Sequence, residues 1–181
     1  KFPRVVPAWS PIGTLREELA REFDLPAACA VFPGVHDSNA GFARPASLLE
    51  ATVDDWDQVF AVHVRAAWLL GRATHPLLAR ARGCLVLTTS VSGQHATPPL
   101  AAYSAAKAAQ IMLMRQMAVE WGPDGIRVNA LSPGLTETPG TAAAYAAPGA
   151  RERRAARIPL GRVAGPDDMA LINLGMAHQG L

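Results

Sequence analysis

A short apolar strand followed by an alanine-rich helix dominates the middle of the sequence. Residues 84–89 form an apolar run bounded by Gly83, which is typical of a buried strand. After a turn rich in glycine and proline, the chain enters a helix near Ala101. This order predicts an α/β unit whose strand ends at the edge of a sheet where such folds bind ligands.

Three polar residues of this unit form a candidate catalytic group. Tyr103 and Lys107 are four positions apart and share one face of the predicted helix, and Ser90 ends the predicted strand. These residue types suit interconversion of a carbonyl and an alcohol. Tyr103 supplies or removes the proton, and Ser90 hydrogen-bonds the oxygen where negative charge develops. A free phenol titrates near ~10, and the charge of Lys107 is expected to lower the pKa of Tyr103.

The alternative interpretation is an ordinary surface helix, because a tyrosine four positions before a lysine is common. The strand, the serine and the turn around the pair favour the catalytic interpretation. The hydride must then come from a cofactor, since no side chain carries one.

Composition excludes several classes of function. With 181 residues, 50% apolar and 18% charged, the sequence has the size and composition of one globular domain. A net charge of +2 without a long basic tract gives no indication of nucleic-acid binding, and no apolar run approaches the ~20 residues of a membrane span. The sequence has no metal-ligand spacing, and its two cysteines lack a CxxC spacing, which favours reduced thiols and a cytoplasmic location. The arginines of residues 151–157 are interpreted as a solvated helix face or as a contact with a phosphorylated substrate carrier.

Helices and strands alternate along the sequence, which predicts an α/β fold with a parallel sheet. The predicted elements are a strand end, a turn and a helix in residues 5–23, a helix at 50–82, strands at 84–89 and 126–131, a helix at 103–121 and a helix starting at 165. Pro76 is expected to kink or divide the helix at 50–82, whose two apolar faces indicate burial on both sides. Residues 24–38 receive no assignment. Residues 135–160 are predicted to be a loop with helical pieces, suited to cover a site.

Several motifs in one order resemble those of the short-chain dehydrogenase/reductase family. They are residues 39–41 (NAG, like the end of the family's NNAG), Ser90, residues 103–107 (YSAAK, like YxxxK), residues 122–134 (like its strand and PG turn), Thr138 and residues 158–162. The resemblance runs almost without gaps from about residue 38 to about residue 170. Within the family it is nearest to the 3-oxoacyl-carrier-protein reductases.

This resemblance implies a single domain over residues 1–181, with a Rossmann-like, doubly wound parallel sheet. It implies NAD(H) or NADP(H) as cofactor and a small-molecule carbonyl or alcohol as substrate, either free or linked to a carrier. It also implies a homo-dimer or homo-tetramer built from the two long helices. The implied catalytic residues are Ser90, Tyr103 and Lys107. The implied cofactor-binding residues are Ile12, Gly13, Asn39, Ala40, Gly41, Tyr103, Lys107, Pro133, Gly134, Leu135 and Thr138.

The sequence departs from the family in its glycine-rich phosphate cradle. The family's TGxxxGIG aligns with residues 6–13, where Pro7 and Pro11 replace two glycines. Glycine lets the backbone approach a pyrophosphate closely, whereas proline fixes φ near about −65° and removes an N–H. A helix N-terminus at this place still attracts an anion.

The sequence also lacks room for some strands of the family fold. Residues 14–40 are too few for the two strand–helix units that the family has there, residues 34–38 are too polar for its usual strand, and the last strand is absent before Leu181. The domain is therefore expected to be truncated, or incompletely represented by this sequence.

His63 stands where the family's long helix usually carries an asparagine, which implies a water held in a proton relay. A histidine can also bind water and move protons near neutral pH, so His63 is a fourth candidate catalytic residue. The alternatives are a decayed site or a satisfied interior histidine. Two functional hypotheses follow: an NAD(P)-dependent oxidoreductase with Tyr103 as acid/base, or a catalytically impaired relative that acts as a scaffold or subunit partner.

Overall fold

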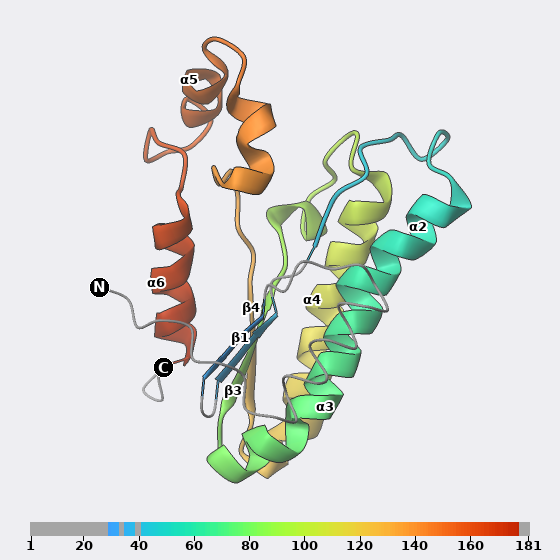
Figure 1. Ribbon diagram of the computed structural model, residues 1–181, viewed down its shortest axis with the longest axis vertical. Helices are drawn as coiled ribbons and strands as arrows, with labels where there is room; N and C mark the ends of the chain where they lie inside the picture. Colours follow the sequence, from blue (N-terminus) through green and yellow to red (C-terminus); the bar gives the residue numbers. More distant parts are fainter. Residues whose placement is uncertain (1–28, 33–34, 39–40, 178–181) are drawn as a thin grey trace. The chain divides into compact units, whose positions relative to one another are not determined.

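The computed structural model describes residues 29–32, 35–38 and 41–177, and the chain divides into two compact units at residues 132 and 133 (Figure 1). The first unit contains the strands β1 (Cys29–Phe32), β2 (Val35–Ser38), β3 (Cys84–Thr88) and β4 (Arg127–Leu131). Its helices are α2 (Val53–Phe60), the π-helix η1 (Ala61–Arg65), α3 (Ala66–Ala81), the 3-10 helix η2 (Val91–Gly93), α4 (Ala101–Trp121) and the 3-10 helix η3 (Gly122–Asp124). The second unit contains η4 (Pro139–Tyr145), α5 (Ala150–Ala155) and α6 (Pro166–Ala177).

The four strands form one sheet in the order β1-β2-β3-β4. β1 pairs with β2 in antiparallel fashion, while β2, β3 and β4 are parallel, with Ser38 opposite Leu87 and Thr88 opposite Leu131. The predicted strands at 84–89 and 126–131 are therefore confirmed. β2 forms in a segment that looked too polar, because ladder pairing uses backbone groups that every residue except proline supplies. The parallel strands end at one edge of the sheet.

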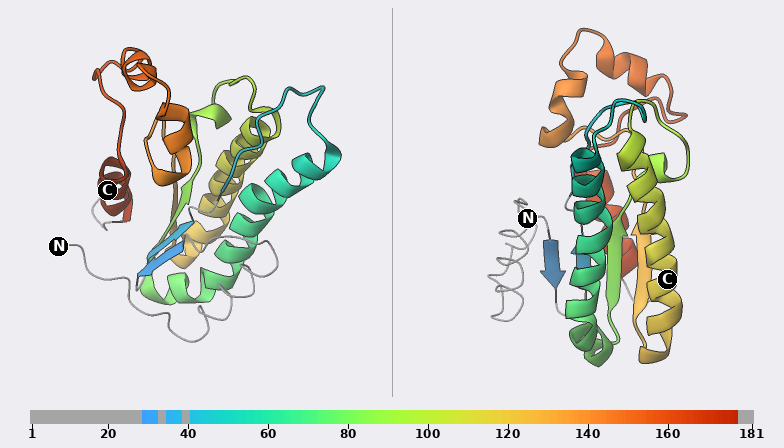
Figure 2. Two further views of the ribbon diagram at one scale, coloured as in Figure 1. Left: turned by 45° about the horizontal axis from the view of Figure 1, so that its top comes forward. Right: turned by 90° about the vertical axis from the view of Figure 1, so that its right-hand side faces the viewer.

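The core of the first unit lies between the sheet and two helices on the same face, α3 and α4 (Figures 1 and 2). Side chains alternate along a strand, so Leu85 and Leu87 both point to this face, and both are 0% exposed. Full burial of each leucine contributes about 1.5–3 kcal/mol. A Cβ on Gly71 would lie 2.9 Å from Trp121, so the absence of a side chain lets α3 approach α4. The buried cluster consists of Ala67, Leu78, Leu85, Leu87, Met117, Ile126 and Val128.

The predicted helix at 50–82 is interrupted at a different place from the one expected. Thr52 caps α2 by accepting a hydrogen bond from the Asp55 N–H, but regular α-helix gives way to the π-helix η1 before α3 begins. Pro76 lies inside α3 and does not divide it. The expectation of burial on both sides is wrong at Trp68, which is 43% exposed.

The second unit follows the sequence prediction closely. η4 and α5 are the helical pieces of the predicted loop, and α6 begins at Pro166, as expected. Asp168 fixes the first turn of α6, because its Oδ2 accepts a hydrogen bond from the Gly165 N–H at 2.8 Å. In the part of the chain that the structure describes, no helix is long and apolar enough to cross a membrane.

Candidate active site

The first unit brings the three predicted catalytic residues together beyond the carboxyl end of β3. Ser90 follows the strand, while Tyr103 and Lys107 lie in the first two turns of α4. The Ser90 side chain acts on the Tyr103 hydroxyl to lower its pKa, and the Lys107 Nζ lies 5.6 Å from the centroid of the Tyr103 ring. Hydroxyl, phenol and amine thus share one site, as the sequence spacing predicts.

Backbone contacts fix the end of β3 against β4. The N–H and the Oγ1 of Thr89 both donate to the carbonyl of Leu131, at 2.7 and 3.0 Å. The Thr89 Oγ1 also lies 2.6 Å from the Ser132 Oγ. Thr89 is 3% exposed, and these bonds satisfy its buried polar groups. These bonds therefore also fix the backbone position of Ser90, the next residue.

A glycine lets the turn after Ser90 pack directly on α4. A Cβ on Gly93 would lie 2.7 Å from the backbone carbonyl carbon of Lys107 and 2.9 Å from the Ala108 nitrogen, closer than side chains approach backbone. The Ser92 N–H donates to the Ser90 Oγ at 3.1 Å, which orients the serine side chain. The close packing of this turn holds Ser90 beside Tyr103.

Lys107 is buried without a carboxylate partner among the described residues. Its side chain is 4% exposed, and its Nζ donates to the Thr88 carbonyl at 2.7 Å and to the Gln110 Oε1 at 3.0 Å. Burial disfavours the ammonium form and lowers the pKa of Lys107 to about 7. Lys107 therefore titrates near neutral pH.

The pKa of Tyr103 moves in the opposite direction from the one expected. Burial raises this pKa above its ordinary value of 10.0, and the hydrogen bond with Ser90 opposes the rise only in part. Lys107 does not reverse this effect, because its Nζ is engaged by Thr88 and Gln110 and is largely neutral above pH 7. Tyr103 is therefore a protonated phenol at neutral pH.

His63 belongs to the same site, since its ring contacts Tyr103 edge-on with centroids 5.2 Å apart. It is 1% exposed, and its Nε2–H donates to the Phe42 carbonyl at 2.7 Å, which leaves Nδ1 as an acceptor. Nδ1 is buried and has no hydrogen-bond partner among the described residues. Burial, and then the charge of Lys107, lower the pKa of His63 to about 4. The structure thus favours a neutral imidazole near pH 7, so any part in proton transfer rests on the Nδ1 lone pair.

Gly41 lies so close to the His63 ring that no side chain fits between them, and replacing Gly41 with alanine should reveal this contact. A Cβ at residue 41 would clash with the His63 Cε1 and would lie 3.0 Å from its Nδ1. We expect Gly41→Ala to lower the free energy of unfolding by about 1–3 kcal/mol, because one group must move. Urea unfolding followed by circular dichroism measures this change.

Two further variants separate this contact from a general effect of the alanine. In a His63→Asn background the smaller side chain should reduce the loss caused by Gly41→Ala to below about 1 kcal/mol. Gly134→Ala serves as control, since a Cβ at residue 134 would meet nothing within 4 Å. Equal losses in both backgrounds would contradict the assigned contact.

Replacing Lys107 with methionine should change stability in a pH-dependent way. Because the pKa of Lys107 falls to about 7 on folding, the unfolded chain binds more protons from pH 7 up to about 10.4. The contribution of Lys107 to stability is therefore lowest below pH 7 and rises with pH through this window. We expect the stability of Lys107→Met relative to wild type to fall by about 2 kcal/mol between pH 7 and pH 9. Urea unfolding at these pH values measures it, and a pH-independent difference would contradict the buried amine.

Some of the predicted cofactor-binding residues lie in the first unit, some lie in the second, and some lie outside the residues that the structure describes. Ile12, Gly13, Asn39 and Ala40 lie outside the described residues. Gly41 packs on His63 in the first unit. Tyr103 and Lys107 lie on α4 of the same unit. Pro133, Gly134, Leu135 and Thr138 belong to the second unit. Their contacts with a cofactor stay predictions.

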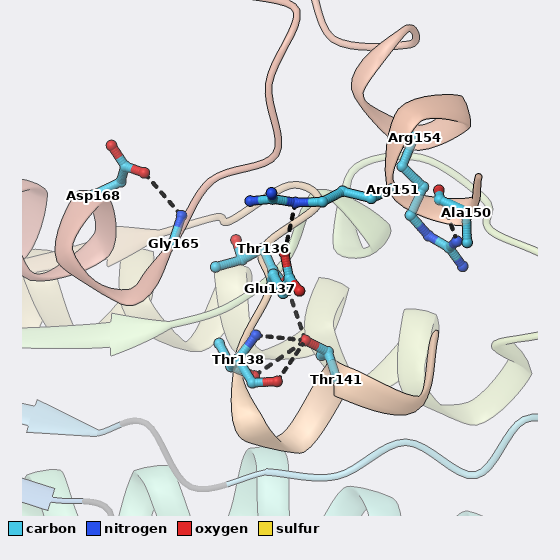
Figure 3. A network of polar contacts seen from close by, with 9 residues as sticks. All are labelled: Thr136, Glu137, Thr138, Thr141, Ala150, Arg151, Arg154, Gly165 and Asp168. Carbon is cyan, nitrogen blue, oxygen red and sulfur yellow. Dashed lines mark hydrogen bonds and ion pairs between the residues drawn. The ribbon is translucent and has the colours of Figure 1, made fainter. Parts of the chain in front are cut away.

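Thr138 takes part in a local network of the second unit (Figure 3). Its N–H donates to the Thr141 Oγ1 at 2.8 Å, and the Thr141 Oγ1 donates to the Thr136 carbonyl at 2.9 Å, which closes the first turn of η4. The neighbouring Glu137 forms an ion pair with Arg151 at 2.9 Å (Figure 3). These bonds fix the start of the predicted substrate loop within its own unit.

Sequence reasoning missed two residues that shape the site. Gln110 is 2% exposed and binds the Lys107 Nζ, and Gly93 allows the close approach of its turn. The contact of Gln110 with Lys107 could have been predicted from the sequence, because a residue three positions after Lys107 lies on the same helix face. Gly93 gave no such signal, since its role depends on packing between distant segments.

The parallel strands β2, β3 and β4, with α3 and α4 on one face, have the architecture of a dinucleotide-binding fold. The family model described as Enoyl-(Acyl carrier protein) reductase matches residues 35–179. This chain belongs to the short-chain dehydrogenase/reductase family, and the Rossmann-like fold predicted from its motifs is confirmed by solved structures of that family.

Two curated relatives illustrate the range of the family. The inactive 2-(S)-hydroxypropyl-CoM dehydrogenase 2 of Xanthobacter autotrophicus is 38% identical over 138 residues, which cover 74% of this chain and 60% of the relative. The 3-oxoacyl-(acyl-carrier-protein) reductase of Thermotoga maritima is 36% identical over 141 residues, which cover 77% of this chain and 56% of the relative. The chain thus spans little more than half the length of these relatives, and it resembles the reductase group that its motifs indicate.

Solved structures give the same fold. A gluconate 5-dehydrogenase of Beutenbergia cavernae with bound NADP has a TM-score of 0.76 and 34% identity, over 91% of this chain and 63% of that one. A 4-hydroxyisoleucine dehydrogenase complexed with NADH has a TM-score of 0.76 and 29% identity, over 93% and 68%.

Proposed function

We propose that this chain is an NAD(P)-dependent oxidoreductase that interconverts a carbonyl and a secondary alcohol, with Tyr103 as acid/base. The observation that carries the proposal is the position of Ser90 after β3 together with Tyr103 and Lys107 one helical turn apart on α4, where the Lys107 Nζ lies 5.6 Å from the centroid of the Tyr103 ring. A surface helix does not require a buried lysine beside a half-buried phenol. Membership of an oxidoreductase family supports the same reaction class.

The described residues fit a nicotinamide cofactor in their donor chemistry. Thr88 and Gln110 accept two hydrogen bonds from Lys107, which leaves the third N–H of the ammonium, or the lone pair of the neutral amine, for a hydroxyl-bearing ligand. Lys107 and Tyr103 would hold the cofactor from the first unit. The motif positions 12–13, 39–41, 133–135 and 138 would complete the binding residues. When bound, NAD(H) or NADP(H) supplies or accepts the hydride.

The side chains supply the proton and polarise the substrate. In carbonyl reduction, the Tyr103 hydroxyl gives its proton to the substrate oxygen, and in alcohol oxidation the phenolate takes it back. Tyr103 is protonated at neutral pH, which is the form that reduction requires. Ser90 donates a hydrogen bond to the substrate oxygen as charge develops there. His63, neutral and packed on the ring, orients Tyr103 and offers Nδ1 as an acceptor.

The remaining properties of the proposal concern partners and location. The substrate is a small carbonyl or alcohol, free or carrier-linked. Assembly as a homo-dimer or homo-tetramer is supported by apolar side chains that α3 and α4 leave exposed, namely Trp68, Met112 and Val119. A cytoplasmic location rests on the spacing of the two cysteines.

A cofactor titration tests the proposal directly. The purified chain is titrated with NADH and with NADPH while its tryptophan fluorescence is followed. We expect saturable binding of at least one of them, and turnover of simple ketones seen as loss of the reduced-nicotinamide absorbance. Absence of binding of both at millimolar concentration would overturn the oxidoreductase proposal.

A second candidate function is that of an impaired relative which acts as a scaffold or subunit partner. The observation that favours it is the presence of Pro7 and Pro11 in the aligned phosphate cradle. The family includes a relative whose name describes it as inactive. This function predicts no cofactor binding and assembly with an active homologue.

Replacing both prolines tests whether the altered cradle, the observation behind the second candidate, limits cofactor binding. If the cradle limits cofactor affinity, Pro7→Gly with Pro11→Gly should tighten NADH or NADPH binding by about tenfold, because glycine restores a backbone N–H and permits close approach. The fluorescence titration measures the dissociation constant. An unchanged constant would show that the cradle does not limit binding.

A further inference from the structure

One buried polar side chain of α4 has no role in the proton transfer described above. Gln110 is 2% exposed and lies almost one turn after Lys107, with its Oε1 3.0 Å from the Lys107 Nζ. Glutamine is rarely this buried, and an apolar residue would fill the position without a polar group to satisfy. The hydrogen bond from Lys107 accounts for a polar side chain at this buried position.

Lys107 depends on few groups for its solvation. Among the described residues, the titratable side chains facing it are Tyr103 on its own helix and His63 on η1, and neither is an anion at neutral pH. β3 contributes the Thr88 carbonyl, and η2 contributes Gly93, which has no side chain. Gln110 is therefore the side-chain acceptor that replaces water around the ammonium.

We propose that Gln110 is a positioning residue for Lys107, and that its amide oxygen both holds the amine at the carboxyl end of β3 and favours its charged form. Lys107 is one of only two lysines in the sequence, against fifteen arginines. An arginine cannot lose its proton, so the chain keeps a titratable base at this position. The use of this charge in catalysis rests on the proposed function, whereas the contact does not.

The small number of lysines makes the test direct. In the full chain labelled with 13C-lysine, Lys1 and Lys107 give the only side-chain Cε signals, so the pH midpoint of Lys107 is measured by NMR without any turnover. We expect Gln110→Met, which removes the acceptor at similar volume, to lower this midpoint by about one pH unit. Gln110→Glu should raise it by about one unit or more, because an opposite charge favours the ammonium.

Opposite shifts in the two variants exclude a purely structural effect, which would move both midpoints in one direction. Gln116→Met is the matched control, since Gln116 is exposed on the same helix and bonds Glu120, and it should leave the midpoint unchanged. Unchanged midpoints, or shifts of the same sign in both Gln110 variants, would overturn the proposal.

Activity measurements separate this proposal from the proposed function. If the chain turns over NADH or NADPH, the pH dependence of kcat/KM should shift in the same direction as the Lys107 midpoint in each variant. If no cofactor binds but the midpoints move in opposite directions, the role of Gln110 stands and the oxidoreductase proposal fails. If turnover is normal and the midpoints do not move, the oxidoreductase proposal stands and the proposed role of Gln110 fails.

Discussion

Replacing Tyr103 with phenylalanine is expected to lower kcat by about 10³-fold, with little change in the fold. In the proposed mechanism the Tyr103 phenol exchanges the proton with the substrate oxygen, while His63 is a neutral imidazole near pH 7. Phenylalanine keeps the ring that packs edge-on against His63, so the loss reports the hydroxyl alone. Consumption of NADH or NADPH with a ketone substrate measures kcat.

Two controls make this result specific. Circular dichroism and the unfolding midpoint should match the wild type, because the hydroxyl is replaced without a change of packing. Ser47→Ala removes an exposed hydroxyl from the same unit, one that bonds only Glu50 in its own turn, and should leave kcat within about twofold. Unchanged turnover in Tyr103→Phe would refute the role of acid/base.

Leu85→Ala should produce the largest loss of stability, about 3 kcal/mol in the free energy of unfolding. Leu85 is 0% exposed, and it belongs to the cluster in which β3 meets α3 and α4. The surrounding side chains come from several elements and cannot all close the cavity left by the missing atoms. Urea unfolding followed by circular dichroism measures this loss.

The same substitution at an exposed leucine provides the comparison. Leu49 is 99% exposed, so Leu49→Ala should change the free energy of unfolding by less than about 0.5 kcal/mol. A loss at Leu85 as small as that at Leu49 would contradict the packing of β3 beneath the two helices.

The parts of the fold that local sequence determines were predictable. β3 and α4 were recognised because an apolar run and an alanine-rich segment encode their structure within a few residues. Tyr103 and Lys107 could be placed on one face for the same reason. Their meeting with Ser90 followed from the general rule that parallel strands end at one edge, combined with the family motif.

Properties that depend on distant contacts were not predictable. The direction of the pKa change at Tyr103 depends on how deeply α4 is buried, which its spacing from Lys107 does not reveal. β2 was missed because its stability comes from pairing with β3 and not from its own composition. Pro76 was expected to break a helix whose actual irregularity lies at η1, where His63 is buried against Tyr103.

The π-helix η1 makes the number of residues in this segment as important as their identity. A π-helix turns the chain by about 80° per residue where an α-helix turns it by about 100°, so the five residues of η1 turn it about as far as four α-helical residues would. Deleting one residue from Ala61–Arg65 would therefore let regular α-helix continue with little rotation of α3 relative to α2. The wide turn that holds His63 against Tyr103 would, however, be lost. An exchange of this segment with a relative should therefore preserve its length before its sequence.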